Sequence, residues 1–266
     1  NTTGAENTGI GYKALEANTT GDYLTAVGSK ALDANTTGTR NTGVGNSAGT
    51  AITTGTGNVA IGSFSLITAT TANYNTAVGH TAMELNTTGL NNTAVGALAL
   101  QANTTGTENV AVGKSALGAN TTASYNVALG RHTLDANTTG EQNVAVGHNA
   151  LTTSTTAGDN TAVGAAALND NLTGAQNTAI GRNAMAANTT GFKNTGLGGY
   201  ALDANTTGAT NVAVGYASLS ANTTASNNTA VGHQSLEVNT TGTNNVAVGA
   251  NALDANTTGT QNVAVG

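Results

Sequence analysis

The side chains best suited to chemistry are four histidines, His80, His132, His148 and His233. Three of them share one place in a 17-residue repeat, but His80 and His148 are four repeats apart. If each repeat is one coil stacked at the strand spacing of about 4.8 Å, these two imidazoles lie about 19 Å apart and cannot share a metal within one chain. Three chains around an axis could form a His₃ site. Lys, Arg and Tyr occupy the same place elsewhere, so we expect a solvated surface and no metal site.

Three basic side chains form a second group. Lys114, Arg131 and His148 occupy the same place in three consecutive repeats of a chain whose net charge is −6. Such a basic column could bind anionic glycans or lipopolysaccharide. The simpler interpretation is that these are surface residues without a binding role, whose charges are screened by salt.

The acidic residues include two pairs one repeat apart, Glu16/Asp33 and Glu237/Asp254. Ca²⁺ requires six to eight oxygen ligands, and the Asp-rich repeat of calcium-binding rolls is absent. No Ser/His/Asp set, carboxylate pocket or phosphate-binding loop is evident, and the absence of Cys removes thiol catalysis, zinc fingers and disulfides. We therefore expect no catalytic, cofactor-binding or metal-binding residue, and a protein that is not an enzyme.

The segment Asn-Thr-Thr-Gly offers two surface functions. Thirteen of its copies fit the N-glycosylation pattern, as at Asn18, Asn35 and Asn103. We interpret this Asn instead as a turn residue that forms side-chain ladders. The second Thr occurs in all 16 copies, and regular Thr rows can bind ice. Ice-binding faces usually carry Thr-x-Thr on a flat strand, whereas these threonines adjoin a Gly turn.

A repeat positions all of these residues. The motif Asn-(Thr/Val)-(Ala/Gly)-(Val/Ile/Leu)-Gly recurs in 16 copies from Asn7 to Gly266, always at the same 17-residue spacing and without insertion or deletion, and Leu24 replaces its Asn in one copy. We number the repeat from position 1 at this Asn. A fixed period of this length predicts a solenoid in which each unit packs on its neighbours. Alternation at positions 2 to 4 predicts a short strand.

The remaining positions predict a narrow core. We expect the aliphatic row at position 4, such as Val112, to be buried. The invariant Gly at position 5 indicates a turn with positive φ or tight contact. Leu at position 9 would be buried by a second strand over positions 8 to 11, and Asn and Gly at positions 12 to 15 would form the other turn. Every charged or aromatic residue falls at positions 6, 7, 10, 11, 16 or 17, which we assign to the surface. The coils around residues 46–72 depart most from the pattern.

Composition limits the partners. The acidic balance argues against nucleic acid, and no apolar run is long enough for a membrane span. A thin core rich in alanine is marginal alone, so we expect chains to pack side by side. Neither end of residues 1–266 carries a capping unit. We therefore expect a single uncapped array of 16 coils that belongs to a longer chain or stacks end to end in a filament.

The motif, for example Asn109-Val110-Ala111-Val112-Gly113, resembles the head repeats of trimeric autotransporter adhesins. The longer form with Asn-Thr-Thr-Gly also looks like repeats of bacteriophage tail fibres. The adhesin repeat is usually shorter than the 17-residue period found in this chain, and the longer period favours the fibre-like version. The resemblance implies a left-handed parallel β-roll, a homotrimer, and an extracellular, cell-surface or virion location.

We therefore expect an all-β parallel β-solenoid with one coil per repeat. Its expected function is that of a rigid adhesive rod whose variable surface residues attach to a host surface or glycan. A tail-fibre shaft and a glycan- or ice-binding solenoid are the alternatives.

Overall fold

The computed structural model describes residues 1–266, which contain strands and turns but no helix. The chain divides into two compact units, residues 1–132 and 133–266, and each is described by itself. Both are all-β parallel solenoids built from 17-residue coils, which confirms the predicted fold class and period.

Each coil contributes one strand of three residues. In the first unit these are β1 (Thr8–Ile10), β2 (Thr25–Val27), β3 (Thr42–Val44), β4 (Val59–Ile61), β5 (Thr76–Val78), β6 (Thr93–Val95), β7 (Val110–Val112) and β8 (Val127–Leu129). In the second they are β9 (Val144–Val146), β10 (Thr161–Val163), β11 (Thr178–Ile180), β12 (Thr195–Leu197), β13 (Val212–Val214), β14 (Thr229–Val231), β15 (Val246–Val248) and β16 (Val263–Val265).

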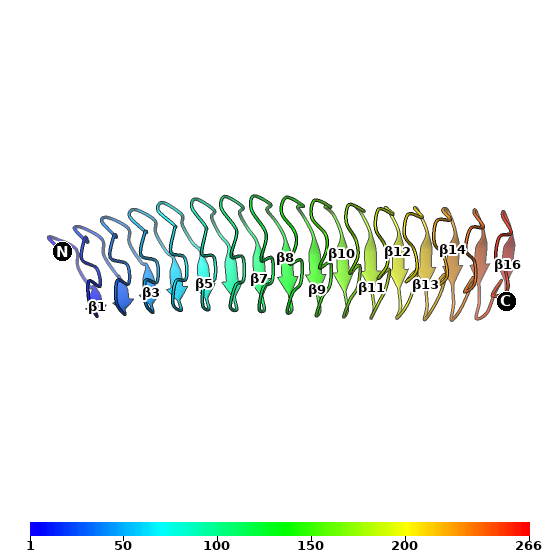
Figure 1. Cartoon of the computed structure of the whole chain (residues 1–266), viewed down its shortest axis with the longest axis horizontal. Helices are drawn as coiled ribbons and strands as arrows, with labels where there is room; N and C mark the ends of the chain where they lie inside the picture. The colour runs from blue at the N-terminus through cyan, green and yellow to red at the C-terminus, as the bar shows by residue number, and fades with distance from the viewer. The chain divides into compact units, whose positions relative to one another are not determined.

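Within each unit, every strand pairs in parallel with the next strand along the chain. The partners lie one full repeat apart, as in Ala94↔Ala111 of the first unit and Ala162↔Ala179 of the second. Figure 1 shows this order, with the strands of consecutive coils side by side. Identical residues therefore form columns from coil to coil.

The strand ends at the invariant glycine for two reasons. Gly96 has φ +134°, a backbone conformation that L side chains rarely adopt. A Cβ at Gly96 would also lie 2.6 Å from the carbonyl oxygen of Gly113 in the next coil. The prediction of positive φ or tight contact at this position is confirmed, and both hold.

The predicted second strand over positions 8 to 11 is wrong, because turns occupy this part of each coil. Leu100 at position 9 is fully buried, as expected, but its φ is +49°. Its backbone N–H still donates to Ala116 of the next coil, at 3.0 Å. A left-handed residue costs about 1–2 kcal/mol, which burial of a leucine, at about 1.5–3 kcal/mol, can offset.

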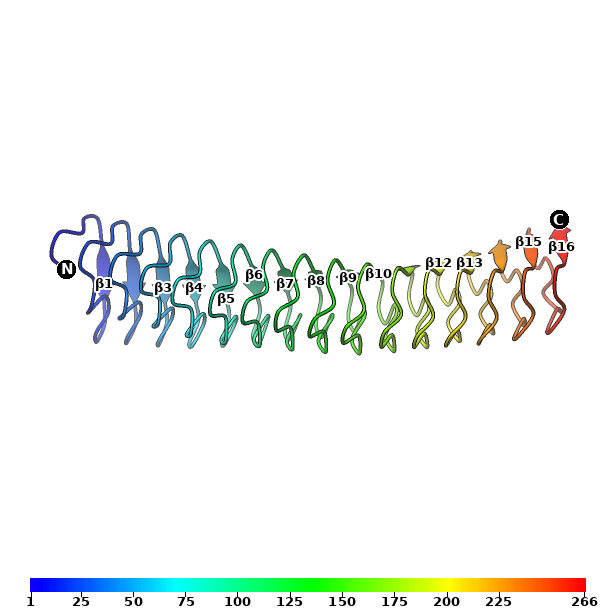
Figure 2. The same ribbon diagram turned by 90° about the horizontal axis from the view of Figure 1, so that it is seen from above.

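Left-handed backbone recurs throughout both units. All non-glycine residues with positive φ have values between 48° and 64°, and they occupy positions 7, 9 and 17 of the repeat. Their repetition explains how a short coil closes with a single strand, since the chain turns sharply at three fixed places. Figure 2 shows the strands on one side of each coil and these irregular turns on the other.

The core face of the strand is the opposite of the one predicted. The alanines at position 3, such as Ala111, are fully buried, whereas Val112 at position 4 is 37% exposed. The interior therefore contains Ala from the strand and Leu from position 9. The small strand residue allows the coil to be thin, because the opposite wall approaches the sheet closely.

Two rows of buried asparagines complete the interior. At position 1, Asn109 donates from Nδ2 to Oδ1 of Asn92 at 3.2 Å and to the carbonyl of Ala123 at 2.8 Å. At position 12, Asn103 Nδ2 donates to Oδ1 of Asn86 at 2.7 Å and to Gly106 O at 3.1 Å. These amide ladders satisfy polar groups that would otherwise be costly to bury.

The irregular coils keep the 17-residue period because one substitution offsets another in the same coil. Gly49 replaces the buried leucine, and Ile52 replaces the row asparagine in the same coil. A Cβ at Gly49 would lie 3.0 Å from Cδ1 of Ile52, so the isoleucine fills the space that the leucine leaves. Ile52 is 1% exposed, and the coil retains an apolar centre.

Candidate functional site

The histidines lie on the surface, as predicted, in turns that follow the strands. His80, His148 and His233 are exposed and His132 is half-buried. His80 contacts Phe64 edge to face at 6.2 Å between ring centroids. His233 stacks on Tyr216 at 5.7 Å with an interplanar angle of 14°. No group of three or more His, Cys, Asp or Glu is placed to hold a metal ion.

The basic column is divided between the two units. Lys114 and Arg131 are exposed in the first, and the carbonyl of Lys114 accepts a hydrogen bond from His132 N–H at 3.0 Å. His148 is exposed in the second unit.

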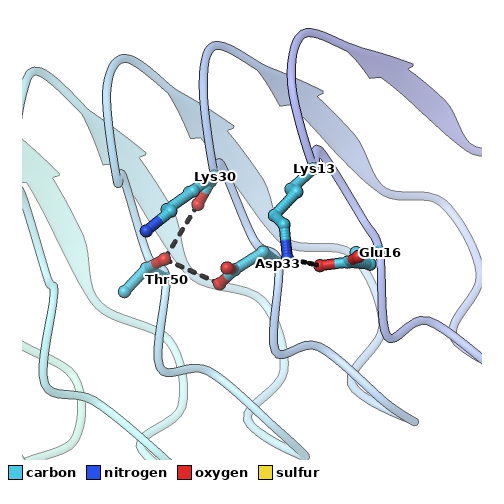
Figure 3. A network of polar contacts seen from close by, with 5 residues as sticks. All are labelled: Lys13, Glu16, Lys30, Asp33 and Thr50. Atoms are coloured by element: carbon cyan, nitrogen blue, oxygen red, sulfur yellow. Dashed lines mark hydrogen bonds and ion pairs between the residues drawn. The ribbon is translucent and has the colours of Figure 1, made fainter.

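The acidic pairs bond to other partners. Figure 3 shows Glu16 paired with Lys13, at 2.9 Å, and Asp33 accepting a hydrogen bond from Thr50 Oγ1, at 2.7 Å. The hydrogen bond to Glu16 raises the pKa of Lys13. In the second unit, Glu237 accepts from Gln234 Nε2 at 2.9 Å. These carboxylates therefore bind neighbouring side chains on the surface.

The Asn-Thr-Thr asparagines point inward. Asn18 is 2% exposed, and Asn35 and Asn103 are fully buried. Their Nδ2 atoms donate along the ladder, as from Asn35 to Asn18 Oδ1 at 3.1 Å. These hydrogen bonds confirm the interpretation as a turn and ladder residue, since Asn35 also donates to Gly38 O within the turn, at 3.1 Å.

The two threonines that follow each ladder asparagine differ. At position 13, Thr104 donates its hydroxyl to the carbonyl of Thr121 in the next coil, at 3.0 Å. At position 14, the threonine is exposed in every coil, as at Thr105 and Thr122. Each unit therefore presents a single column of exposed threonines beside a turn.

A surface hollow in the second unit is lined by Asp135, Ala136, Thr152 and Thr153. Ser154 follows directly and is fully buried, with no hydrogen-bond partner for Oγ. Ser154 replaces a ladder asparagine, which explains the unused hydroxyl. The Thr153 hydroxyl at its edge donates to the carbonyl of Asn169 at 2.8 Å.

The outer face of the strands was missed by the sequence reasoning. Val95, Val112 and Ile61 at position 4 are 37%, 37% and 38% exposed in the first unit, and Ile180 is 43% exposed in the second. Thr or Val at position 2 lies beside them on the same face. Each unit thus presents an apolar strip along its sheet.

A cation–aromatic ladder in the second unit was also missed. It consists of Arg182, Tyr200, Tyr216 and His233, which come from four consecutive coils. The sequence signal was the 17-residue spacing of Tyr216 and His233, with Tyr200 one position later in its own coil.

The chain has no match in two comparisons with known proteins. No protein-family model matches the chain. No curated protein matches it either. The structure contains no helix with the length and hydropathy of a membrane span.

Proposed function

We propose that this chain is a structural segment of an extracellular fibre in which copies pack along the outer face of the sheet. The observation that supports the proposal most is the apolar strip, with Val, Ile or Leu exposed or half-buried at position 4 of each strand. Contiguous exposed apolar surface of this kind marks protein–protein contact.

The composition of the core supports the same proposal. Ala111 and Leu117 are fully buried, but the interior of each coil contains few larger side chains. Burial of about 25 cal/mol per Å² of apolar surface makes such a thin core weakly stabilising by itself. Packing the strips of several copies together would add a second core between chains. We propose a homotrimer with a left-handed roll, as in the adhesin heads that the repeat resembles.

Attachment is the proposed role of the residues that vary between coils. All charged and aromatic side chains are exposed or half-buried. The framework of Gly, Ala, Leu and Asn fixes their spacing, so substitutions at these places alter the surface and preserve the coil. A cell-surface adhesin and a phage tail-fibre shaft share this design, and we propose a cell-surface or virion location.

Light scattering of the purified chain tests the proposal. We expect a trimer, and dilution should dissociate it only at low concentration. A monomer at all concentrations would contradict self-association along the strip. Open-ended polymers would favour a filament over an adhesin head.

The exposed threonine column at position 14 favours a second candidate, an ice-binding solenoid. A regular row of hydroxyls can order water in register with ice, although the single column here is narrower than the usual paired rows. Thermal hysteresis in concentrated solution would support this function, and freezing without it would exclude it.

A further inference from the structure

The two residues after each strand-closing glycine, repeat positions 6 and 7, form what we name the strand-exit turn. These turns contain five of the seven Lys and Arg residues, since only Arg40 and Lys193 lie elsewhere. The five are Lys13, Lys30, Lys114, Arg131 and Arg182. All four histidines are also there, but none of the 13 Asp and Glu residues. No carboxylate thus lies within these turns, although Glu16 and Glu237 contact Lys13 and Gln234 from position 10.

The strand-exit turns also carry half of the aromatic residues, four of eight. These are Tyr12, Phe64, Tyr200 and Tyr216. In the second unit, aromatic and cationic side chains meet in the ladder of Arg182, Tyr200, Tyr216 and His233. Cations beside aromatic rings suit a ligand that is anionic and has apolar ring faces.

The ladder is continuous over four coils. The Arg182 guanidinium lies over the Tyr200 ring, 5.9 Å from its centroid. Tyr200 meets Tyr216 at 5.8 Å with an interplanar angle of 72°. Tyr216 then stacks on His233. At about 4.8 Å per coil, the four rungs extend over about 14 Å.

The backbone holds these side chains in place before any ligand arrives. Tyr200 N–H donates to the carbonyl of Arg182 at 3.0 Å, and Gln234 N–H donates to that of Tyr216 at 2.9 Å. Gly199 has no side chain, and the Tyr216 ring lies 3.6 Å from where its Cβ would be. Tyr216 is nevertheless 52% exposed. Such preorganisation reduces the entropy lost on binding.

We propose that this ladder binds an acidic polysaccharide whose chain runs along the coils. The tyrosine rings would contact the C–H faces of the sugars, and Arg182 would pair with uronate carboxylates. The assignment deepens the proposed attachment function and rests on it. A single-stranded nucleic acid also has rings and negative charge, but its binding depends on clustered cations. The ladder has one permanent cation, which favours the sugar polymer.

Binding of the chain of residues 1–266 to polygalacturonate, measured by calorimetry at low salt, tests the proposal. We expect saturable binding that weakens with added salt, and weaker binding to neutral dextran and to single-stranded DNA. Tyr216→Ala and Arg182→Gln should each weaken binding at least tenfold. Alanine occupies the place of Tyr216 in other coils, as at Ala250, so the fold should persist. Tyr200→Asn provides a second variant, because Asn occupies that left-handed place at Asn183 and Asn251.

The matched control lies outside the strand-exit turns. Lys193 and Phe192 form a comparable exposed pair, with Nζ 6.0 Å from the ring centroid. Lys193→Gln and Phe192→Ala should leave polygalacturonate binding unchanged. Absence of binding by the native chain, equal losses in the control variants, or tighter binding of single-stranded DNA would each overturn the proposal. Light scattering on the same samples measures self-association, which does not require the ladder. A chain that self-associates but does not bind polygalacturonate would overturn the ladder proposal and leave the proposed fibre role intact.

Discussion

Ala111 and Val112 are adjacent on β7 and face opposite sides of it, the first fully buried and the second 37% exposed. The same substitution at the two sites should therefore have different effects. Ala111→Asp places a carboxylate in the core and should destabilise the coil by about 3 kcal/mol or more. Val112→Asp should change the free energy of unfolding of the dissociated chain by about 0.5 kcal/mol or less but weaken self-association. Thermal melting of dilute samples and light scattering of concentrated ones separate the two effects. The opposite order would place Val112 in the core.

The burial of the ladder asparagines predicts their state in a glycosylating host. Asn103 is fully buried and donates to Asn86 and Gly106, so it should stay unmodified when the folded chain is secreted. Intact mass spectrometry should return the sequence mass. A mass increase removed by glycosidase, and mapped to Asn103, would show that the turn opens or is modified before folding.

Ser154 interrupts the asparagine row between Asn137 and Asn171, and its buried hydroxyl has no partner. Ser154→Asn should restore the repeat and raise the free energy of unfolding by about 1–2 kcal/mol, through hydrogen bonds that each contribute about 1 kcal/mol. Urea unfolding of the two proteins measures this difference. Ser29→Asn, at a half-buried turn residue, is the control and should have little effect. Destabilisation by Ser154→Asn would mean that the site lacks room for an amide.

Glu108 is exposed at position 17 with φ +57°, which is unfavourable for a residue of its type. Asparagine tolerates this conformation better, so Glu108→Asn should stabilise the chain by up to about 1 kcal/mol. Glu108→Val should be destabilising, because a β-branched residue fits the left-handed region poorly. Thermal midpoints should therefore rank Asn above Glu and Glu above Val. Equal midpoints would show that the backbone at this turn relaxes.

The carboxyl group of Asp203 should make the stability of the folded chain depend on pH. Partial burial raises the pKa of its carboxyl above 3.8. Folding therefore favours the protonated form, and the contribution to stability is largest below pH 3.8 and declines as pH rises through the folded pKa. Asp203→Asn removes this decline, so its stability advantage over the native chain should grow from pH 3 to pH 7. Asp254→Asn, at an exposed equivalent position, is the control. An advantage independent of pH would contradict the burial effect.

The sequence predicted the features that follow from recurrence. Period, strand location, the invariant glycine and the buried leucine all repeat, and each has a local physical reason. The side on which the strand residues lie was not predictable in the same way. Alternation places Ala111 and Val112 on opposite faces but does not say which faces inward, and the larger residue is usually the buried one.

The prediction of a second strand over positions 8 to 11 was wrong for a related reason. Leu100 signals burial, but nothing in its residue type indicates φ +49°, because leucine usually avoids this region. The aromatic ladder was harder to predict, since Tyr200 and Tyr216 occupy different repeat positions and meet only through the geometry of the turn. Comparing residues at the same repeat position does not reveal contacts between different positions of neighbouring coils.

The constant register, one repeat per coil, has a genetic consequence. In each unit, a strand pairs with its neighbours in the same register as every other strand, as the equivalent pairs Thr76↔Thr93 and Thr93↔Val110 illustrate. Loss or duplication of one repeat, wherever the breakpoint falls within it, joins two surfaces that already match. Unequal recombination in the gene can therefore change the number of coils in whole steps without a new fold, and the number of coils can evolve separately from the side chains that the turns display.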